Sequence, residues 1–302
     1  MTTEIKKTIC TACPRKCGVL RQEGEKGFCG VSGPGVFLAR AALHFWEEPC
    51  ISGTHGSGTV FFSGCNLRCI YCQNDAISTM KTAKRVPVER LSEIFLELEE
   101  KGAHNLNLVT PTHYALEIHE ALRSARRRGL TLPVVWNTSG YEDPETLRML
   151  EGDIDVFLTD FKYMDKELAA RFSKAPDYPS VAKAALREMF RQKPRLLTDE
   201  NGLLREGIIV RHLLLPGHVR NAKDVVRYVY SSYGDDVLLS LMNQYTPMRE
   251  FPEAPELGRR VTKREYEKLI SFALDLGVTN ALIQEGGTQK ESFIPAFDYE
   301  GV

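Results

Sequence analysis

The chain has 302 residues, a length that allows one large domain or two small ones. It carries 39 Lys and Arg against 40 Asp and Glu, so its charge gives no reason to expect nucleic acid or an acidic membrane as the main partner. No apolar run is long enough to span a membrane, and the first ten residues lack the apolar stretch of a secretion signal. These features predict a folded cytoplasmic protein.

Residues 1–35 contain four cysteines and show no apolar periodicity. The cysteines are Cys10, Cys13, Cys17 and Cys29. Clustered thiols in a reducing compartment indicate metal ligands before disulfides. Four thiolates can close a tetrahedral zinc site or saturate an iron–sulfur cluster. We therefore expect either Zn or a [4Fe–4S] cluster in this segment, which is too short to build a core of its own.

From residue 36 onward, short apolar runs alternate with amphipathic helical segments. The expected strands are 58–62, 105–109, 132–136, 154–158, 207–214, 237–242 and 280–284. Repeated strand–helix alternation predicts parallel strands joined by right-handed crossovers. We expect an α/β fold over residues 36–302, an incomplete (β/α)6 barrel with an accessory seventh strand, and a hairpin near residues 195–206.

The first expected strand runs into a glycine-containing loop that holds three cysteines, Cys65, Cys69 and Cys72. Three thiolates on a cubane cluster leave one iron without a protein ligand, as in catalytic sites that keep an open position. The alternative is a structural zinc knuckle that takes its fourth ligand from Cys50 or His55. The loop is therefore predicted to hold either an open cluster or a closed zinc ion.

This loop has the spacing C-x3-C-x-aromatic-C, with Tyr71 as the aromatic residue. In that spacing it resembles the signature of the radical S-adenosylmethionine (radical SAM) superfamily. Further segments resemble one branch of it, the iron–sulfur proteins similar to the pyruvate formate-lyase activating enzyme, over roughly residues 8–297. These segments include Cys10-Thr-Ala-Cys13-Pro-Arg-Lys-Cys17, Glu47-Glu-Pro-Cys-Ile-Ser-Gly53, Asn137-Thr-Ser-Gly-Tyr141 and Asp160-Phe-Lys-Tyr-Met-Asp165.

The resemblance implies an oxygen-sensitive oxidoreductase with a partial TIM barrel. In that family Cys65, Cys69 and Cys72 would hold a [4Fe–4S] cluster, and its open iron would bind S-adenosyl-L-methionine (SAM). Reduction of the cluster, by a reductant such as flavodoxin or ferredoxin, would split SAM and release a 5′-deoxyadenosyl radical. A glycyl-radical protein is one partner that the resemblance implies.

Polar residues follow the ends of six expected strands, and parallel barrels place their chemistry at that edge. We expect the following residues to shape the SAM pocket together with Tyr71, which would pack near the adenine: Thr110, Thr112, His113, Asn137, Thr138, Asp160, Lys162, Arg211 and Asn243.

Two of these segments are interpreted through the resemblance. Asp160 and Lys162 match an Asp-x-Lys pair that contacts SAM in activating enzymes. The Gly-Gly-Glu segment that binds the SAM ammonium in that family is replaced here by residues 110–113, so the ammonium contact would fall to Thr110 and Thr112. Asn137 stands where the family has an aspartate, which weakens any monovalent-cation site.

Two classes of function remain open at this point. The first is a radical SAM enzyme that activates a glycyl-radical enzyme or, alternatively, modifies another protein side chain or a small metabolite. The second is a non-catalytic electron-transfer or metal-binding module with an iron–sulfur cluster or zinc. The second class predicts no SAM binding.

Overall fold

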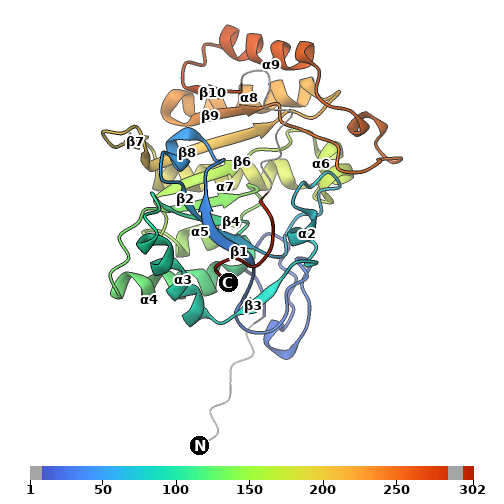
Figure 1. The fold of residues 1–302 in the computed structure, drawn as a ribbon. Helices are drawn as coiled ribbons and strands as arrows, with labels where there is room; N and C mark the ends of the chain where they lie inside the picture. Colours follow the sequence, from blue (N-terminus) through green and yellow to red (C-terminus); the bar gives the residue numbers. More distant parts are fainter. Residues whose placement is uncertain (1–8, 285–294) are drawn as a thin grey trace, which may run out of the picture.

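A ten-stranded, mostly parallel sheet forms the centre of this computed structural model, which describes residues 9–284 and 295–302 (Figure 1). Along the sheet the strands follow the order β10, β9, β8, β6, β5, β4, β2, β1, β3, and β7 pairs with β8. All neighbours from β10 to β2 are parallel, whereas β1 runs antiparallel to β2 and β3. The predicted α/β fold with a mostly parallel sheet is confirmed.

The bounds of the elements are as follows. The strands are β1 (Val36–His44), β2 (Ser57–Phe62), β3 (Lys84–Val86), β4 (Leu106–Val109), β5 (Val134–Thr138), β6 (Val156–Asp160), β7 (Leu197–Thr198), β8 (Leu204–Leu213), β9 (Leu238–Met242) and β10 (Ala281–Ile283). The α-helices are α1 (Pro49–Ser52), α2 (Asp75–Ser78), α3 (Val88–Glu100), α4 (Ala115–Arg127), α5 (Pro144–Met149), α6 (Lys166–Ser173), α7 (Tyr178–Gln192), α8 (Val219–Tyr233) and α9 (Lys263–Leu276). The short 3-10 helices are η1 (Arg21–Glu23), η2 (Thr112–Tyr114), η3 (Gly234–Asp236) and η4 (Pro255–Gly258).

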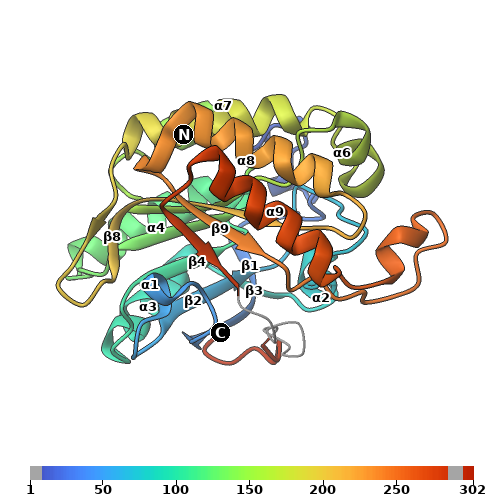
Figure 2. The same ribbon diagram turned by 90° about the horizontal axis from the view of Figure 1, so that it is seen from above.

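The long helices α3, α4, α7, α8 and α9 each bury a set of apolar residues. Figure 2 shows α7, α8 and α9 following one another along one face. Helix α9 illustrates why the sequence folds this way locally: Thr262 and Glu265 form a capping box at its start, and Gly277 ends it in the left-handed conformation. No helix in the described part of the chain has both the length and the apolarity to cross a membrane.

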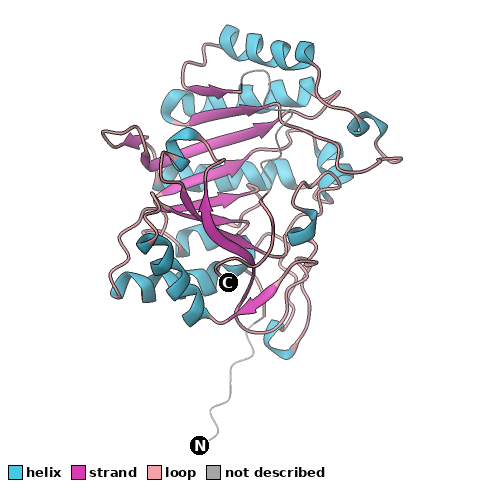
Figure 3. Cartoon of the chain, in the orientation of Figure 1, coloured by secondary structure: helices cyan, strands magenta, loops and turns pink. Residues whose placement is uncertain are grey.

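Strand β1 is an element that the sequence analysis did not include. Its residues are rich in alanine, which has a low strand propensity, so the segment lacks the β-branched signal of the other strands. Pairing with β2 and β3 nevertheless fixes it. The last residues of the chain also lie along β1, since Ala41 N donates to Glu300 O at 2.8 Å (Figure 3).

The segment ahead of β1 is irregular. Among residues 9–35, only η1 is helical. The first eight residues of the expected metal-binding segment, 1–35, lie outside the described residues. At the hairpin expected near residues 195–206, β7 pairs antiparallel with β8, and Gly202 turns the chain between them with a φ of 76°.

Candidate active site

The carboxyl ends of the parallel strands surround a cavity of about 250 Å³. Val109 of β4 pairs in register with Asn137 of β5, and Asp160 of β6 pairs with Arg211 of β8, so these strand ends lie at one edge of the sheet. The cavity is lined by His44, Trp46, Glu47, Phe61, Cys69, Tyr71, Cys72, Gln73, Asn74, Val109, Asn137, Asp160, Lys162, Arg211, Leu213, Met242, Gln244 and Pro295. This edge is where a parallel α/β enzyme places its chemistry.

The cysteine loop leaves the fully buried strand β2 through Gly64, whose φ is 88°. A Cβ atom at this position would lie 2.8 Å from Cys29 O, so both the conformation and the space require glycine. Strand β2 lies between β1 and β4, which fixes the direction in which the chain enters the loop. The three cysteines are therefore presented from a rigid support.

The thiols of Cys65, Cys69 and Cys72 lie close enough to affect one another. Burial raises the pKa of Cys65, and the neighbouring thiols of Cys69 and Cys72 raise it further. Burial also raises the pKa of Cys72, to about 11. The ammonium group of Lys162 acts in the opposite direction and lowers the pKa of all three thiols. One buried cation thus favours the thiolate form that binds metal.

Asp160 and Lys162 form an ion pair at the cavity wall, with 2.5 Å between Lys162 Nζ and Asp160 Oδ2. Burial alone would raise the pKa of Asp160, but Lys162 and Arg211 outweigh it and lower that pKa. Burial would lower the pKa of Lys162, but the Asp160 carboxylate and the Cys69 thiolate raise it. Both side chains therefore carry their charge inside the cavity.

The guanidinium group of Arg211 binds three acceptors from three different elements. Its Nε lies 3.0 Å from Asp160 Oδ1, its Nη2 lies 2.6 Å from Asn137 Oδ1, and its Nη1 lies 3.1 Å from Glu47 Oε2. Arg211 therefore arranges the polar side chains of β5, β6 and the segment after β1 around the cavity.

Glu47 is a site residue that the sequence analysis missed. Besides Arg211, its carboxylate accepts hydrogen bonds from the amides of Asn107, at 3.2 Å, and Asn137, at 3.1 Å. The segment 47–53 was noted in the sequence as a motif, but it follows no expected strand, and β1 had not been predicted. Without β1, whose end lies beside the start of β2, there was no reason to place Glu47 against the side chains of Asn107 and Arg211.

Two of the expected pocket residues are engaged away from the cavity. The hydroxyls of Thr112 and Thr138 both donate to Oε1 of the fully buried Glu142, with 2.5 Å for Thr112, and Trp136 Nε1 donates to the same oxygen at 3.2 Å. Thr138 shares a strand face with Trp136, whereas Asn137 points to the other face and lines the cavity. The structure does not bring these two threonines to the cavity.

Three further expected residues also lie outside the cavity lining. His113 is fully buried with its Nε2 3.0 Å from Ser63 O, and burial lowers its pKa to about 3. Thr110 takes a left-handed φ of 59°, an uncommon conformation for a β-branched residue, and its N–H donates to Asn137 O at 2.9 Å. Asn243 is buried beyond the end of β9, where its N–H donates to Gln284 Oε1.

The four N-terminal cysteines gather in a second place. Burial raises the pKa of Cys13 to about 12, and the thiols of Cys29, Cys10 and Cys17 add to that rise. The backbone N–H of residue 28 donates to Cys17 Sγ at 3.3 Å, and Arg21 Nη2 donates to Cys29 Sγ at 3.4 Å. These thiols thus share a local environment with one guanidinium group beside them.

The two cysteine groups are joined through the ring of Phe28. The Arg15 guanidinium lies 3.9 Å from the centroid of this ring, and the Arg68 guanidinium lies 5.2 Å from it. Arg15 Nε also donates to Asn66 O at 2.9 Å, and Arg68 Nη2 donates to Phe28 O at 2.6 Å. Each arginine comes from one cysteine motif, so the motifs are held directly against each other.

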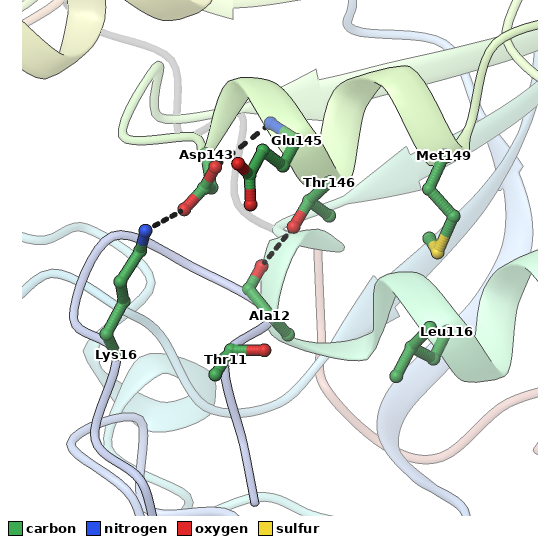
Figure 4. A pocket seen from close by; sticks show the side chains of 8 residues that line it. All are labelled: Thr11, Ala12, Lys16, Leu116, Asp143, Glu145, Thr146 and Met149. Atoms are coloured by element: carbon green, nitrogen blue, oxygen red, sulfur yellow. Dashed lines mark hydrogen bonds and ion pairs between the residues drawn. The ribbon is translucent and has the colours of Figure 1, made fainter.

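A second hollow, of about 330 Å³, lies beside the N-terminal segment (Figure 4). It is lined by Thr11, Ala12, Lys16, Leu116, Asp143, Glu145, Thr146 and Met149. Lys16 pairs with Asp143 at 3.1 Å across it, and Thr146 Oγ1 donates to Ala12 O at 3.2 Å. No cysteine lines this hollow, so we regard it as part of the contact between the N-terminal segment and α5.

The donor sets of the two cysteine groups fit iron–sulfur or zinc chemistry, since both contain sulfur alone. Within residues 9–284 and 295–302, no three His, Cys, Asp or Glu side chains converge closely enough to ligate a single metal ion. Cys50 belongs to neither group. It packs beside a hydrophobic cluster that includes Ile51 and Val135, and burial raises its pKa to about 11.

Comparison with known proteins gives a family. The profile of the Radical SAM superfamily matches residues 59–201. The uncharacterized protein MJ0674 of Methanocaldococcus jannaschii is 31% identical over 284 residues, which cover 90% of this chain and 77% of that protein. The uncharacterized protein MJ0808 of the same organism is 25% identical over 268 residues, which cover 82% and 74%.

Solved structures of another protein, SuiB, are also similar. SuiB of Streptococcus suis bound to its precursor peptide SuiA gives a TM-score of 0.47 at 13% identity, and the match covers 70% of this chain and 43% of SuiB. The chain thus spans less than half of the length of SuiB.

Proposed function

The chain belongs to the radical SAM superfamily, which implies a [4Fe–4S] cluster and SAM, and we propose that Cys65, Cys69 and Cys72 hold that cluster. Such a cluster, when bound and reduced, supplies the electron that splits SAM into methionine and a 5′-deoxyadenosyl radical. The observation that supports the proposal is that Cys69, Cys72 and Lys162 line one cavity at the carboxyl edge of the sheet, with Cys65 in the same loop. The chain is accordingly an enzyme.

Lys162 is the residue best suited to bind the SAM carboxylate. An ammonium group has three donors, and Asp160 Oδ2 accepts one of them. The remaining donors are available to a carboxylate in the cavity. Asp160 fixes the position of Nζ, so the lysine is held in place before its ligand arrives.

The sequence analysis placed Arg211 in the SAM pocket, and in the structure its guanidinium group donates to Asp160, Asn137 and Glu47. We propose that Arg211 positions these acceptors around the ligand. Glu47 and Asp160 then offer carboxylate oxygens to a cation in the cavity, and we propose that they bind the SAM ammonium. This assignment replaces the missing Gly-Gly-Glu segment with side chains from two other elements.

Anaerobic reconstitution of the full chain with iron, sulfide, a reductant and SAM tests the proposal. We expect 5′-deoxyadenosine from the wild type and from a Cys50→Ala variant, and none from a Cys69→Ala variant. Cys50 is the matched control because it is a half-buried cysteine outside both groups. A wild type that holds a full cluster but forms no 5′-deoxyadenosine would contradict the function.

We also propose that Cys10, Cys13, Cys17 and Cys29 hold a second [4Fe–4S] cluster, with zinc as the alternative. The mutual effect of the thiols on the pKa of Cys13 supports a common site. In this arrangement residues 1–35 form a metal-binding segment and residues 36–302 form the radical SAM unit, an incomplete barrel with the β7–β8 hairpin. Iron and zinc contents of the wild type and of a Cys13→Ala variant distinguish the two metals, since loss of zinc alone excludes the cluster.

The target of the radical is proposed at the level of its class. Activation of a glycyl-radical enzyme rests on the sequence resemblance, and the relatives that were found are uncharacterized. The other hypothesis is a different protein side chain or a small metabolite. We propose a cytoplasmic reaction with a reductant such as flavodoxin or ferredoxin. Transfer of deuterium from a glycine-labelled partner into 5′-deoxyadenosine would identify activation.

A further inference from the structure

The last residue of helix α6 contacts the cysteine loop. Ser173 is fully buried, and its Oγ lies 3.0 Å from Cys69 Sγ. The backbone holds the two segments together, since Ile70 N donates to Phe172 O at 2.8 Å. A hydroxyl group in this position cannot reach water, so its hydrogen bonds must go to its protein neighbours.

Ser173 is the end, nearest Cys69, of a row of three buried hydroxyl groups. Its Oγ lies 2.8 Å from the hydroxyl of Tyr163, which in turn lies 2.7 Å from the hydroxyl of Tyr71. Both tyrosines are buried, and a neutral phenol carries one proton. Each of the three hydroxyls therefore has one proton to donate.

A thiolate at Cys69 sets the direction of every bond in this row. A thiolate has no proton and can only accept, so the hydroxyl of Ser173 must donate to it. Ser173 then has no second proton for Tyr163, which must donate to Ser173. By the same reasoning Tyr71 donates to Tyr163. All three protons point toward the sulfur of Cys69.

We infer that Ser173 is a positioning residue that tunes the reduction potential of the catalytic cluster by donating a hydrogen bond to the Cys69 thiolate, supported by Tyr163 and Tyr71. The inference rests on the proposed function of the three cysteines. Reduction adds negative charge to the cluster and its sulfur ligands, and a hydrogen bond to a charged acceptor is stronger. The bond therefore favours the reduced state and raises the potential.

Tyr71 connects this row to the cavity. It is a lining residue, and its oxygen donates to Tyr163 while keeping lone pairs that can accept. A donor group of a bound ligand at Tyr71 would polarise the row further, since hydrogen bonds in series strengthen one another. The same row thus gives a ligand in the cavity an effect on the thiolate of Cys69.

The test is a potentiometric titration of the reconstituted full chain without SAM. The EPR signal of the reduced cluster measures the extent of reduction at each potential. We expect Ser173→Ala to lower the equilibrium constant for one-electron reduction roughly tenfold, which is about 59 mV to more negative potential. Tyr163→Phe should lower it in the same direction but less, because the hydroxyl of Ser173 remains. The control is Ser180→Ala, an exposed serine of α7 whose Oγ bonds to Asp177 O.

The outcomes separate this inference from the proposed function. An unchanged potential in Ser173→Ala at full iron and sulfide content overturns the inference and leaves the function intact. If Ser173→Ala fails to hold a cluster, Tyr163→Phe decides in its place, and an unchanged potential there overturns the inference. A wild type that takes up no cluster at Cys65, Cys69 and Cys72 overturns both, and this is seen before any variant is compared.

Discussion

The two cysteine groups of this protein have different supports. Cys65, Cys69 and Cys72 follow a fully buried strand with paired neighbours on both sides, and Lys162 lines the same cavity as Cys69 and Cys72. The N-terminal group lies in a segment with little regular structure, where a few hydrogen bonds and Arg21 hold the thiols. From this difference we expect the first group to keep its arrangement without metal, and the second to depend on the metal proposed for it.

Removing one thiol from each group gives the largest expected contrast. Cys72→Ala should reduce 5′-deoxyadenosine formation more than about 100-fold and change the melting temperature by no more than about 3 °C. Cys13→Ala should instead lower the melting temperature more and keep measurable SAM cleavage. Thermal unfolding and product analysis on both variants measure this. Equal losses of stability in the two variants would break the comparison.

Removing the Arg211 guanidinium group tests how much it stabilises the buried carboxylates at the cavity. Arg211→Ala leaves the buried carboxylates of Asp160 and Glu47 without their partner, so we expect a loss of about 3–5 kcal/mol in urea unfolding. Arg126→Ala is the control, because its pair with Asp155, at 3.6 Å, is partly exposed and should contribute about 1 kcal/mol or less. Similar losses for both would mean that the cavity tolerates an unpaired charge.

The support behind β5 can be tested by pH. Burial raises the pKa of Glu142 from 4.5 to about 7, against the hydrogen bonds from Thr112, Thr138 and Trp136 that lower it. The folded-state pKa is the higher one, so ionisation opposes folding. The stability from the neutral form is complete below about pH 4.5 and is lost as the pH rises through about 7.

Glu142→Gln should remove that part of the pH dependence. We expect the variant to lack a decline on the order of 3 kcal/mol between pH 4.5 and 8, measured by chemical denaturation at several pH values. Its oxygen can still accept from the three donors. Glu100→Gln, at an exposed position of α3, should follow the wild-type curve. If the free energy of unfolding of Glu142→Gln fell with pH in parallel with that of the wild type, a group other than Glu142 would be responsible for the pH dependence.

The smallest expected effect concerns the link between the two groups. Phe28→Leu removes the ring between two guanidinium groups, and we expect a loss of about 1–2 kcal/mol with faster release of the N-terminal metal to a chelator. Phe37→Leu is the matched control, since its ring faces one cation, Arg85, at 4.9 Å. Equal metal release from both variants would show that the contact at Phe28 does not stabilise the N-terminal segment.

Much of the fold followed from patterns in the chain. Strand–helix alternation predicted the parallel sheet, and the same rule placed Asn137, Asp160 and Arg211 at one edge, where the structure brings them together. These predictions needed only strand parity and chain direction, which are local properties.

The remaining features of the fold and the site depend on tertiary contacts, which the hydrophobic periodicity of the sequence does not specify. β1 is alanine-rich and is fixed by its neighbours in the sheet, so the sequence pattern did not predict it. The position of Glu47, which follows β1 and binds Arg211, was therefore not predicted either. Thr112 and Thr138 were grouped with the cavity because they follow strands, but a buried carboxylate from Glu142 binds them on the other face. The parity of Thr138 with Trp136 was a signal that could have separated it from Asn137.

The clasp of Arg15 and Arg68 on one aromatic ring has a consequence for protein engineering. The two arginines are part of different motifs, and each donates to a backbone oxygen of the other motif, Arg15 to Asn66 O and Arg68 to Phe28 O. A chimera that takes its N-terminal cysteine segment from a relative would therefore lose these contacts unless the new segment supplies matching residues. We expect it to function only when that segment brings an aromatic ring for Arg68 and an arginine for Asn66 O.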